Sequence, residues 1–184
     1  MQLWDKSGKD NTESTVQAAV ARAKELSISQ VVVASNTGAT ARLFVDSGLE
    51  IVCVTHQVGF REPGGDEMPA KVRQEFAQLG IEVLTTTHLF RGVNRGFTQA
   101  HGGFDSGMVA ADTLRLFGQG TKVAVEVAVM ALDAGLISYG QDVISVGGSG
   151  HGADTALVLC PAHSGEFLQT KIREIICKPR EWER

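Results

Sequence analysis

Short apolar runs of strand length recur along the chain and are separated by longer segments with apolar residues at helical spacing. Residues 31–34 are the clearest run, because three valines precede an alanine, which is typical of a strand buried on both faces of a parallel sheet. Further strands are expected at 50–55, 81–85, 142–146 and 155–160, with a late edge strand at 172–177. Helices are expected from the capping residues 10–13 to Leu26, from Ala39 to Gly48, from Pro69 to Gly80, and over about 106–117 and 121–134.

This alternation predicts a single α/β domain over residues 1–184, folded as a three-layer α/β/α sandwich with a mostly parallel sheet of about five strands. The strand at 155–160 is expected to pair back on the strand at 142–146. If the latter lies beside the strand at 31–34, the loops after Ala34 and Val146 meet where the strand order reverses. Ligands bind at such points in open α/β sheets.

The loop after Ala34 is expected to hold an anion. It joins a buried strand to a helix start, where free backbone amides and hydroxyl groups are available as donors. The expected anchor consists of Ser35, Asn36, Thr37, Gly38 and Thr40. Its sequence matches neither the GxxxxGK[ST] phosphate loop nor the GxGxxG pattern, so an ordinary strand-to-helix turn that binds nothing stays an alternative.

Residues 86–107 show no clear periodicity and contain five glycines, which predicts a long functional or mobile loop. Arg91 and Arg95 lie in it, and their guanidinium groups suit a phosphate or a flavin carbonyl, with plain solvation as the alternative. His56, His88 and His151 each follow an expected strand end, so they are expected to line one pocket. Acid–base catalysis stays open for them, whereas no HxH or HxxxH pair predicts a metal site.

Glu126 and Asp154 could be interpreted as functional acids, Glu126 as a buried one, but the sequence favours structural roles for both. Glu126 interrupts an apolar helix, but Lys122 and Asp133 share its helical stripe, which predicts a solvated or ion-paired face. Asp154 follows the glycine-rich segment 147–152 and is expected to brace it.

Charge and composition narrow the class of ligand. The net charge is −4 and the pI is near 5.7, so no basic field is expected to attract nucleic acid or an anionic membrane. A small phosphorylated molecule held by a local site fits better. No apolar signal segment opens the chain and the longest apolar helix is interrupted by Glu126, which favours a cytoplasmic protein. The sequence does not decide whether the protein forms a homo-oligomer.

Several motifs spread over nearly the whole chain carry a family resemblance. They are DNTE at 10–13, VVAS before Thr37-Gly38, VTH at 54–56 with GFRE at 59–62, GVNRG at 92–96, VEVAVMA at 125–131 with DAGL at 133–136, and GADTALVL at 152–159. With them the chain resembles the C-terminal α/β domain of pyruvate kinase, and more closely the free-standing archaeal and bacterial proteins of that superfamily.

The resemblance implies where a ligand lies and what it is. In pyruvate kinases that bind a sugar bisphosphate, the Ser/Thr-rich turn holds a phosphate and a late glycine-rich loop closes over it. Carried over, the anchor turn faces Gly147, Gly148, Ser149, Gly150 and His151. The free-standing relatives imply flavin mononucleotide as cofactor, without pyruvate kinase activity because the catalytic barrel is not present. A sugar-phosphate sensor and a small flavin-dependent or phosphosugar enzyme remain alternatives.

Overall fold

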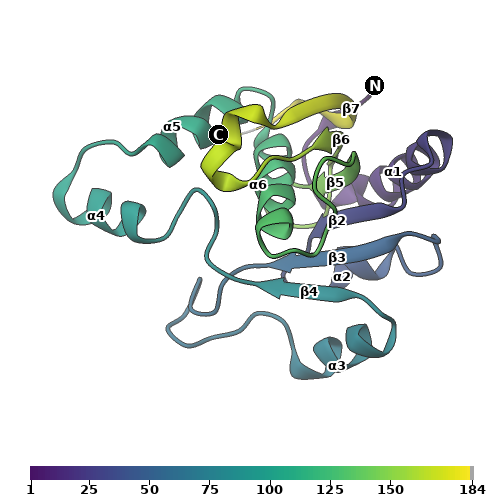
Figure 1. The fold of residues 1–184 in the computed structure, drawn as a ribbon, viewed down its shortest axis with the longest axis horizontal. Coiled ribbons are helices and arrows are strands. Elements are labelled where there is room, and N and C mark those ends of the chain that lie inside the picture. Colours follow the sequence, from purple (N-terminus) through teal and green to yellow (C-terminus); the bar gives the residue numbers. More distant parts are fainter. Residues whose placement is uncertain (183–184) are drawn as a thin grey trace.

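A seven-stranded sheet forms the centre of the protein, as the computed structural model shows for residues 1–182 (Figure 1). The strands lie in the order β1-β7-β6-β5-β2-β3-β4. Their bounds are Gln2–Lys6 for β1, Gln30–Ala34 for β2, Glu50–Thr55 for β3, Glu82–Thr85 for β4, Val143–Gly147 for β5, Thr155–Cys160 for β6 and Lys171–Glu181 for β7.

The sheet is larger than the sequence predicts, and it is mixed. β6 runs antiparallel to both β5 and β7, whereas the other paired strands are parallel. The expectation of about five mostly parallel strands is therefore wrong in number, and β7 is no edge strand because β1 pairs with it. β1 escaped prediction because it has no apolar run and no buried residue. A contact with a distant segment stabilises it: the indole N–H of Trp4 donates to the backbone carbonyl of Asp154.

Helices cover both faces of the sheet. Their bounds are Thr12–Leu26 for α1, Ala39–Arg42 for α2, Ala70–Gln78 for α3, Val93–His101 for α4, Ser106–Arg115 for α5 and Gln119–Asp133 for α6, with 3-10 turns η1 at Lys9–Asn11 and η2 at Ser164–Gln169. α1, α2 and α3 pack on one face and α6 on the other, so the layered α/β architecture holds. Within residues 1–182 no helix is both long and apolar enough to span a bilayer.

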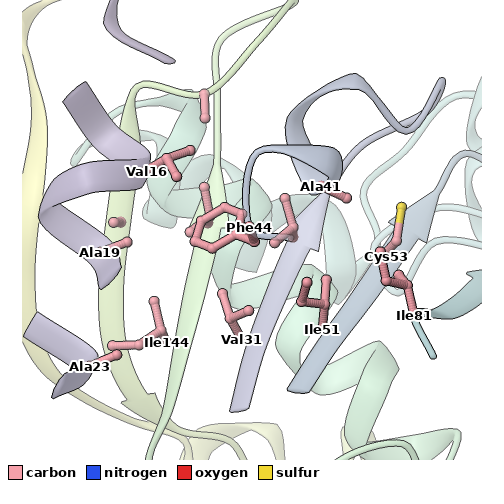
Figure 2. Packing of buried hydrophobic residues seen from close by; sticks show 14 of the residues in the cluster. Val16, Ala19, Ala23, Val31, Ala41, Phe44, Ile51, Cys53, Ile81 and Ile144 are labelled. Atoms are coloured by element: carbon pink, nitrogen blue, oxygen red, sulfur yellow. The ribbon is translucent and has the colours of Figure 1, made fainter. Parts of the chain in front are cut away.

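The strand at 31–34 is buried on both faces, as its run of valines predicts. Val31 faces Ile51 and Ile144 of the neighbouring strands and the small residues of α1, with Phe44 filling the space beside them (Figure 2). Val32 points the other way, into the cluster formed with α6. Alternate residues of one strand therefore stabilise two separate layers.

The order of the central strands places the two loops of interest together. β2 pairs in parallel with β5, with Val31 opposite Ile144 and Val33 opposite Val146. β6 pairs back on β5, as expected. The loops that follow Ala34 and Gly147 therefore leave the same edge of the sheet between neighbouring strands, which is the position where open α/β sheets bind ligands.

Segment 86–107 is not one irregular loop, because it contains the helix α4. This helix has no buried residue, and it extends from the body of the protein at the left of Figure 1. Gly92 and Gly102 flank it with φ angles of 76° and 75°, a backbone that favours glycine. Those glycines, read as signs of a loop, instead mark where the helix begins and ends.

Candidate functional site

Two adjoining pockets open at the carboxyl ends of β2, β3 and β5. The first, here the histidine pocket, has a volume of about 290 Å³ and lies between β3 and α6. The second, the turn pocket, has a volume of about 370 Å³ and lies at the turn after β2. Ala34, Asn36 and Gly152 line both pockets, so the two pockets adjoin and are together called the cleft below. Each pocket alone is at the small end of known ligand sites, roughly 300–1,000 Å³.

The turn pocket is built from the predicted anchor and from two cations distant in sequence. Thr37 and Thr40 line it together with Lys9, Arg61 and His151. These residues bring hydroxyl, ammonium, guanidinium and imidazole donors to one concave surface, which suits an oxyanion.

Ser35 and Gly38 maintain the shape of the turn. The Ser35 hydroxyl accepts hydrogen bonds from the amides of Thr40 and Ala41, at 3.1 and 3.4 Å, so it satisfies two amides at the start of α2. Gly38 has φ 85°, and a β-carbon there would lie 2.7 Å from Val72 and 2.9 Å from Phe76 of α3. The helix amides expected to bind an anion are therefore used in part by the protein itself.

Asn36 and His56 form the wall between the pockets. The Asn36 amide oxygen accepts from the His56 backbone amide at 3.0 Å, which places its nitrogen 3.2 Å from Nε2 of the His56 ring. Nε2 must then accept, so Nδ1 carries the proton of the neutral ring and donates to Glu67. Arg61 holds the other oxygen of Glu67 at 2.8 Å. Both nitrogens of His56 are therefore engaged by protein groups.

Aromatic and imidazole rings line the histidine pocket. The rings of His56 and Phe60 are stacked with centroids 3.7 Å apart, and His88 lies 5.3 Å from His56. The Arg91 guanidinium lies over Phe60, 4.3 Å from its centroid. This surface offers flat contacts and a cation to a planar ligand.

A buried ion pair forms the floor of the histidine pocket. Lys122 and Glu126, one turn apart on α6, contact each other with side chains only 7% and 2% exposed. Glu126 also accepts from the Phe90 amide at 3.1 Å and lies 3.7 Å from His88 Nδ1. The expected polar face is therefore wrong: Glu126 is a buried acid, and only its pairing with Lys122 agrees with the expectation. Burial lowers the pKa of Lys122, although the charge of Glu126 opposes this.

The glycine-rich segment after β5 is held in place by Asp154. This buried carboxylate accepts from the amides of Gly8 and Ser149 and from the Thr155 hydroxyl, so the predicted bracing role is confirmed. Gly147 packs against α6, and Gly148 and Gly152 approach neighbouring backbone too closely for a β-carbon. The absence of a side chain at these glycines lets the segments of the cleft wall pack closely.

Comparison with known proteins agrees with this architecture. The family model for the pyruvate kinase alpha/beta domain matches residues 13–159. The chain belongs to this family. Of the site residues described above, Glu67, Lys122 and Glu126 lie within the matched range, and Lys9 precedes it.

Three solved pyruvate kinase structures from Cryptosporidium parvum, one of them in complex with ADP, are similar to this chain at 18% sequence identity. They cover 73%, 80% and 72% of it, with TM-scores of 0.37, 0.40 and 0.36. The same matches cover 20%, 22% and 20% of the kinase chains. The pyruvate kinase alpha/beta domain described here therefore spans about a fifth of the length of the solved enzymes it matches.

The predicted site residues are distributed over four places. The histidine pocket contains Asn36, His56, His88, Arg91, Arg95 and Gly148, and the turn pocket contains Asn36, Ser35, Thr37, Thr40 and His151. Ser149 and Gly150 line a third depression beside Trp182, which shares Arg115 and Gln119 with the histidine pocket. Gly38 and Gly147 are packed within the fold.

Sequence reasoning missed several residues of the cleft. They are Lys9, Phe60, Arg61, Glu67, Met108, Arg115, Lys122 and Glu126. Lys122 and Glu126 carried a usable signal, since opposite charges four residues apart inside an apolar helix indicate a buried pair. Phe60 and Arg61 lie in the GFRE motif at 59–62, but Lys9 and Glu67 carried no signal, because only the fold brings their loops to the cleft.

The first prediction concerns the protonation of His88. Burial lowers its pKa below the usual 6.5, and the negative charge of Glu126 offsets part of this effect. As the pH falls below 6.5 the unfolded chain binds this proton first, so folding stability falls until the lower folded pKa is reached. We expect an NMR titration to place the pKa of His88 below 6.5, and Glu126→Gln to lower it further. A midpoint at or above the ordinary histidine value would contradict the burial of this ring.

Proposed function

We propose that this pyruvate kinase alpha/beta domain binds a small phosphorylated ligand in the cleft formed by the two pockets, and that this ligand is flavin mononucleotide. The observation that carries the proposal is the junction of the pockets at Asn36 and Gly152. One side of the junction offers donors for an oxyanion, and the other offers rings for a planar group. A ligand with a phosphate at one end and a flat ring at the other matches both sides.

The turn pocket supports the phosphate end. Thr37, Thr40 and Lys9 line it, and Arg61 reaches it from the loop after β3, where it pairs with Glu67 of the same lining. Hydrogen bonds from charged and hydroxyl donors to a phosphate are about twice as strong as neutral ones. Because the chain as a whole carries a net charge of −4, this local donor set is what would attract an anion.

The histidine pocket supports the ring end. The rings of His56, Phe60 and His88 border this pocket, and the guanidinium of Arg91, which lies over Phe60, suits a ring carbonyl. Met108 and Phe90 supply apolar wall. Flavin mononucleotide needs both this surface and the turn pocket, whereas riboflavin needs only the former.

A sugar phosphate is the second candidate, because several cations line the cleft. It would use the same turn pocket, in a regulatory module that binds without transforming its ligand, and it would not need the stacked rings. An enzymatic role has less support: both nitrogens of His56 contact protein groups, and those of His88 lie 3.4 Å from the Thr55 carbonyl oxygen and 3.7 Å from Glu126. The proposal therefore concerns binding and does not extend to phosphoenolpyruvate turnover.

Titration with flavin mononucleotide and with riboflavin tests the proposal. We expect the phosphorylated form to bind more tightly, and Thr40→Ala to weaken it by about 1–2 kcal/mol without affecting riboflavin. Gly38→Val is unsuitable as a binding test, because its side chain would collide with Val72 and Phe76 and disturb the fold. Equal affinity for the two flavins would show that the turn pocket does not bind the phosphate. If neither flavin binds, the ligand is not a flavin.

A further inference from the structure

The carboxylate of Glu67 contacts one residue of each pocket. Its Oε1 accepts from Arg61, which lines the turn pocket, at 2.8 Å. Its Oε2 accepts from Nδ1 of His56, which lines the histidine pocket. The side chain of Glu67 is 21% exposed, so water and salt screen these contacts only in part. The two pockets are therefore linked through a single carboxylate.

Both His56 and Glu67 are held in place by the surrounding structure. The backbone amide of His56, directly after β3, donates to Asn36 at 3.0 Å. Glu67 lies between Asp66 and the buried Met68, and Asp66 accepts from the Met68 amide at 3.0 Å. An ion pair joins Asp66 to α3 as well. The imidazole and the carboxylate therefore have little freedom to move apart.

Arg61, in contrast, can exchange its partner. Its side chain is 60% exposed, and all residues from 57 to 65 are exposed or only partly buried. The loop itself is closed by a hydrogen bond of 2.8 Å from the Gly59 amide to the Gly65 carbonyl. Rotation of the long Arg61 side chain can therefore move the guanidinium away from Glu67 while the loop keeps its shape.

We propose that Glu67 is a positioning residue that couples the two pockets. A phosphate in the turn pocket draws the Arg61 guanidinium away from Glu67, and the released carboxylate changes the hydrogen bonding of the His56 ring. Glu67 offers Arg61 one oxygen, because its other oxygen contacts His56, whereas a phosphate accepts two N–H bonds from the same guanidinium. The proposal rests on the proposed function for the phosphate, and it assigns the communication between the two ends of the ligand to Glu67.

The same arrangement makes Glu67 oppose the binding of phosphate, because its negative charge lies in the lining of the turn pocket. Glu67→Gln removes this charge, while the amide oxygen of glutamine can still accept from Nδ1 of His56. We expect this variant to bind inorganic phosphate about two- to fivefold more tightly than the wild type, the size of effect that partly exposed ion pairs have. Loss of a merely structural residue would not tighten binding, so a variant that binds phosphate no more tightly would contradict the proposal.

NMR with inorganic phosphate as the probe tests the coupling. The amide signals of Thr37 and Thr40 report on the turn pocket, and the ring nitrogens of His56 report on the histidine pocket. In the wild type we expect both sets of signals to shift with one midpoint as phosphate is added. In Glu67→Gln the threonine signals should still shift, whereas the response of the His56 nitrogens should be largely lost. A His56 response of full size in this variant would contradict the role of Glu67.

Arg61→Gln tests the coupling without any ligand, because it releases Glu67 permanently. It should move the ring nitrogens of His56 in the direction that phosphate produces. The matched control is Arg42→Gln, which breaks an exposed ion pair with Glu75 outside both pockets and should leave these nitrogens unchanged.

The two variants also separate the coupling from the proposed function. Threonine signals of the turn pocket that do not respond to phosphate would refute the phosphate site, while the effect of Arg61→Gln would still decide the coupling. Ring nitrogens of His56 that respond to Arg61→Gln no more than to Arg42→Gln would overturn the proposal.

Discussion

Replacing Gly147 by alanine is expected to lower the free energy of unfolding by about 3 kcal/mol or more. A β-carbon at this position would collide with the Gly120 carbonyl oxygen and lie 2.8 Å from the Ala124 amide nitrogen. Both atoms belong to the backbone of α6, which cannot move aside as a flexible side chain would. The Ser145 hydroxyl ties the same helix to β5, through a 2.7 Å hydrogen bond to the Ala124 carbonyl. Overpacking of this kind costs about 1–3 kcal/mol when neighbours can relax, and more when they cannot.

Urea denaturation measures this effect, with Gly165→Ala as the control. A β-carbon at Gly165 would meet open space and the φ angle there is not positive, so this replacement should change the unfolding free energy by less than about 0.5 kcal/mol. A Gly147→Ala variant as stable as this control would show that β5 and α6 are not packed as described. The cleft wall that they form would then also be described wrongly.

Removing Glu126 alone is expected to destabilise the protein by about 3–5 kcal/mol, because Lys122 would remain buried without its counter-ion. Glu126→Leu also removes the acceptor of the Phe90 amide. The double variant Lys122→Met with Glu126→Leu should recover most of the loss, since no buried charge is left and the apolar surroundings of α6 accept both side chains.

A double-mutant cycle in urea separates these contributions. Wild type, the two single variants and the double variant are compared at one pH. We expect the double variant to be clearly more stable than the sum of the single effects predicts. Additive effects would mean that the two side chains are solvated independently, as the polar stripe in the sequence had allowed.

The buried layers were predictable from the sequence because burial on two faces leaves a direct pattern. Three consecutive valines at 31–33 cannot alternate between core and solvent, so they indicate a central strand. The same reasoning located β3, β5 and β6. The adjacency of β2 and β5 was assumed in the sequence analysis, and the structure confirms it.

Elements stabilised by partners distant in sequence were not predictable. β1 exists because it pairs with β7 and because Trp4 contacts Asp154, 150 residues later. α4 lacks a buried face, so no apolar stripe facing the core marks it. The histidine pocket depends on Phe60, Arg115 and Lys122, which come from three separate segments, and only the fold brings them together.

The central claim is that one phosphorylated ligand occupies both pockets, and a crystal structure of the protein with flavin mononucleotide tests it most directly. The account predicts the phosphate within hydrogen-bond distance of Thr37, Thr40 or Lys9, and the flavin ring against His56 and Phe60, with Arg91 at its edge. A flavin bound outside the cleft, or a cleft that stays empty at saturating flavin mononucleotide, would contradict the account.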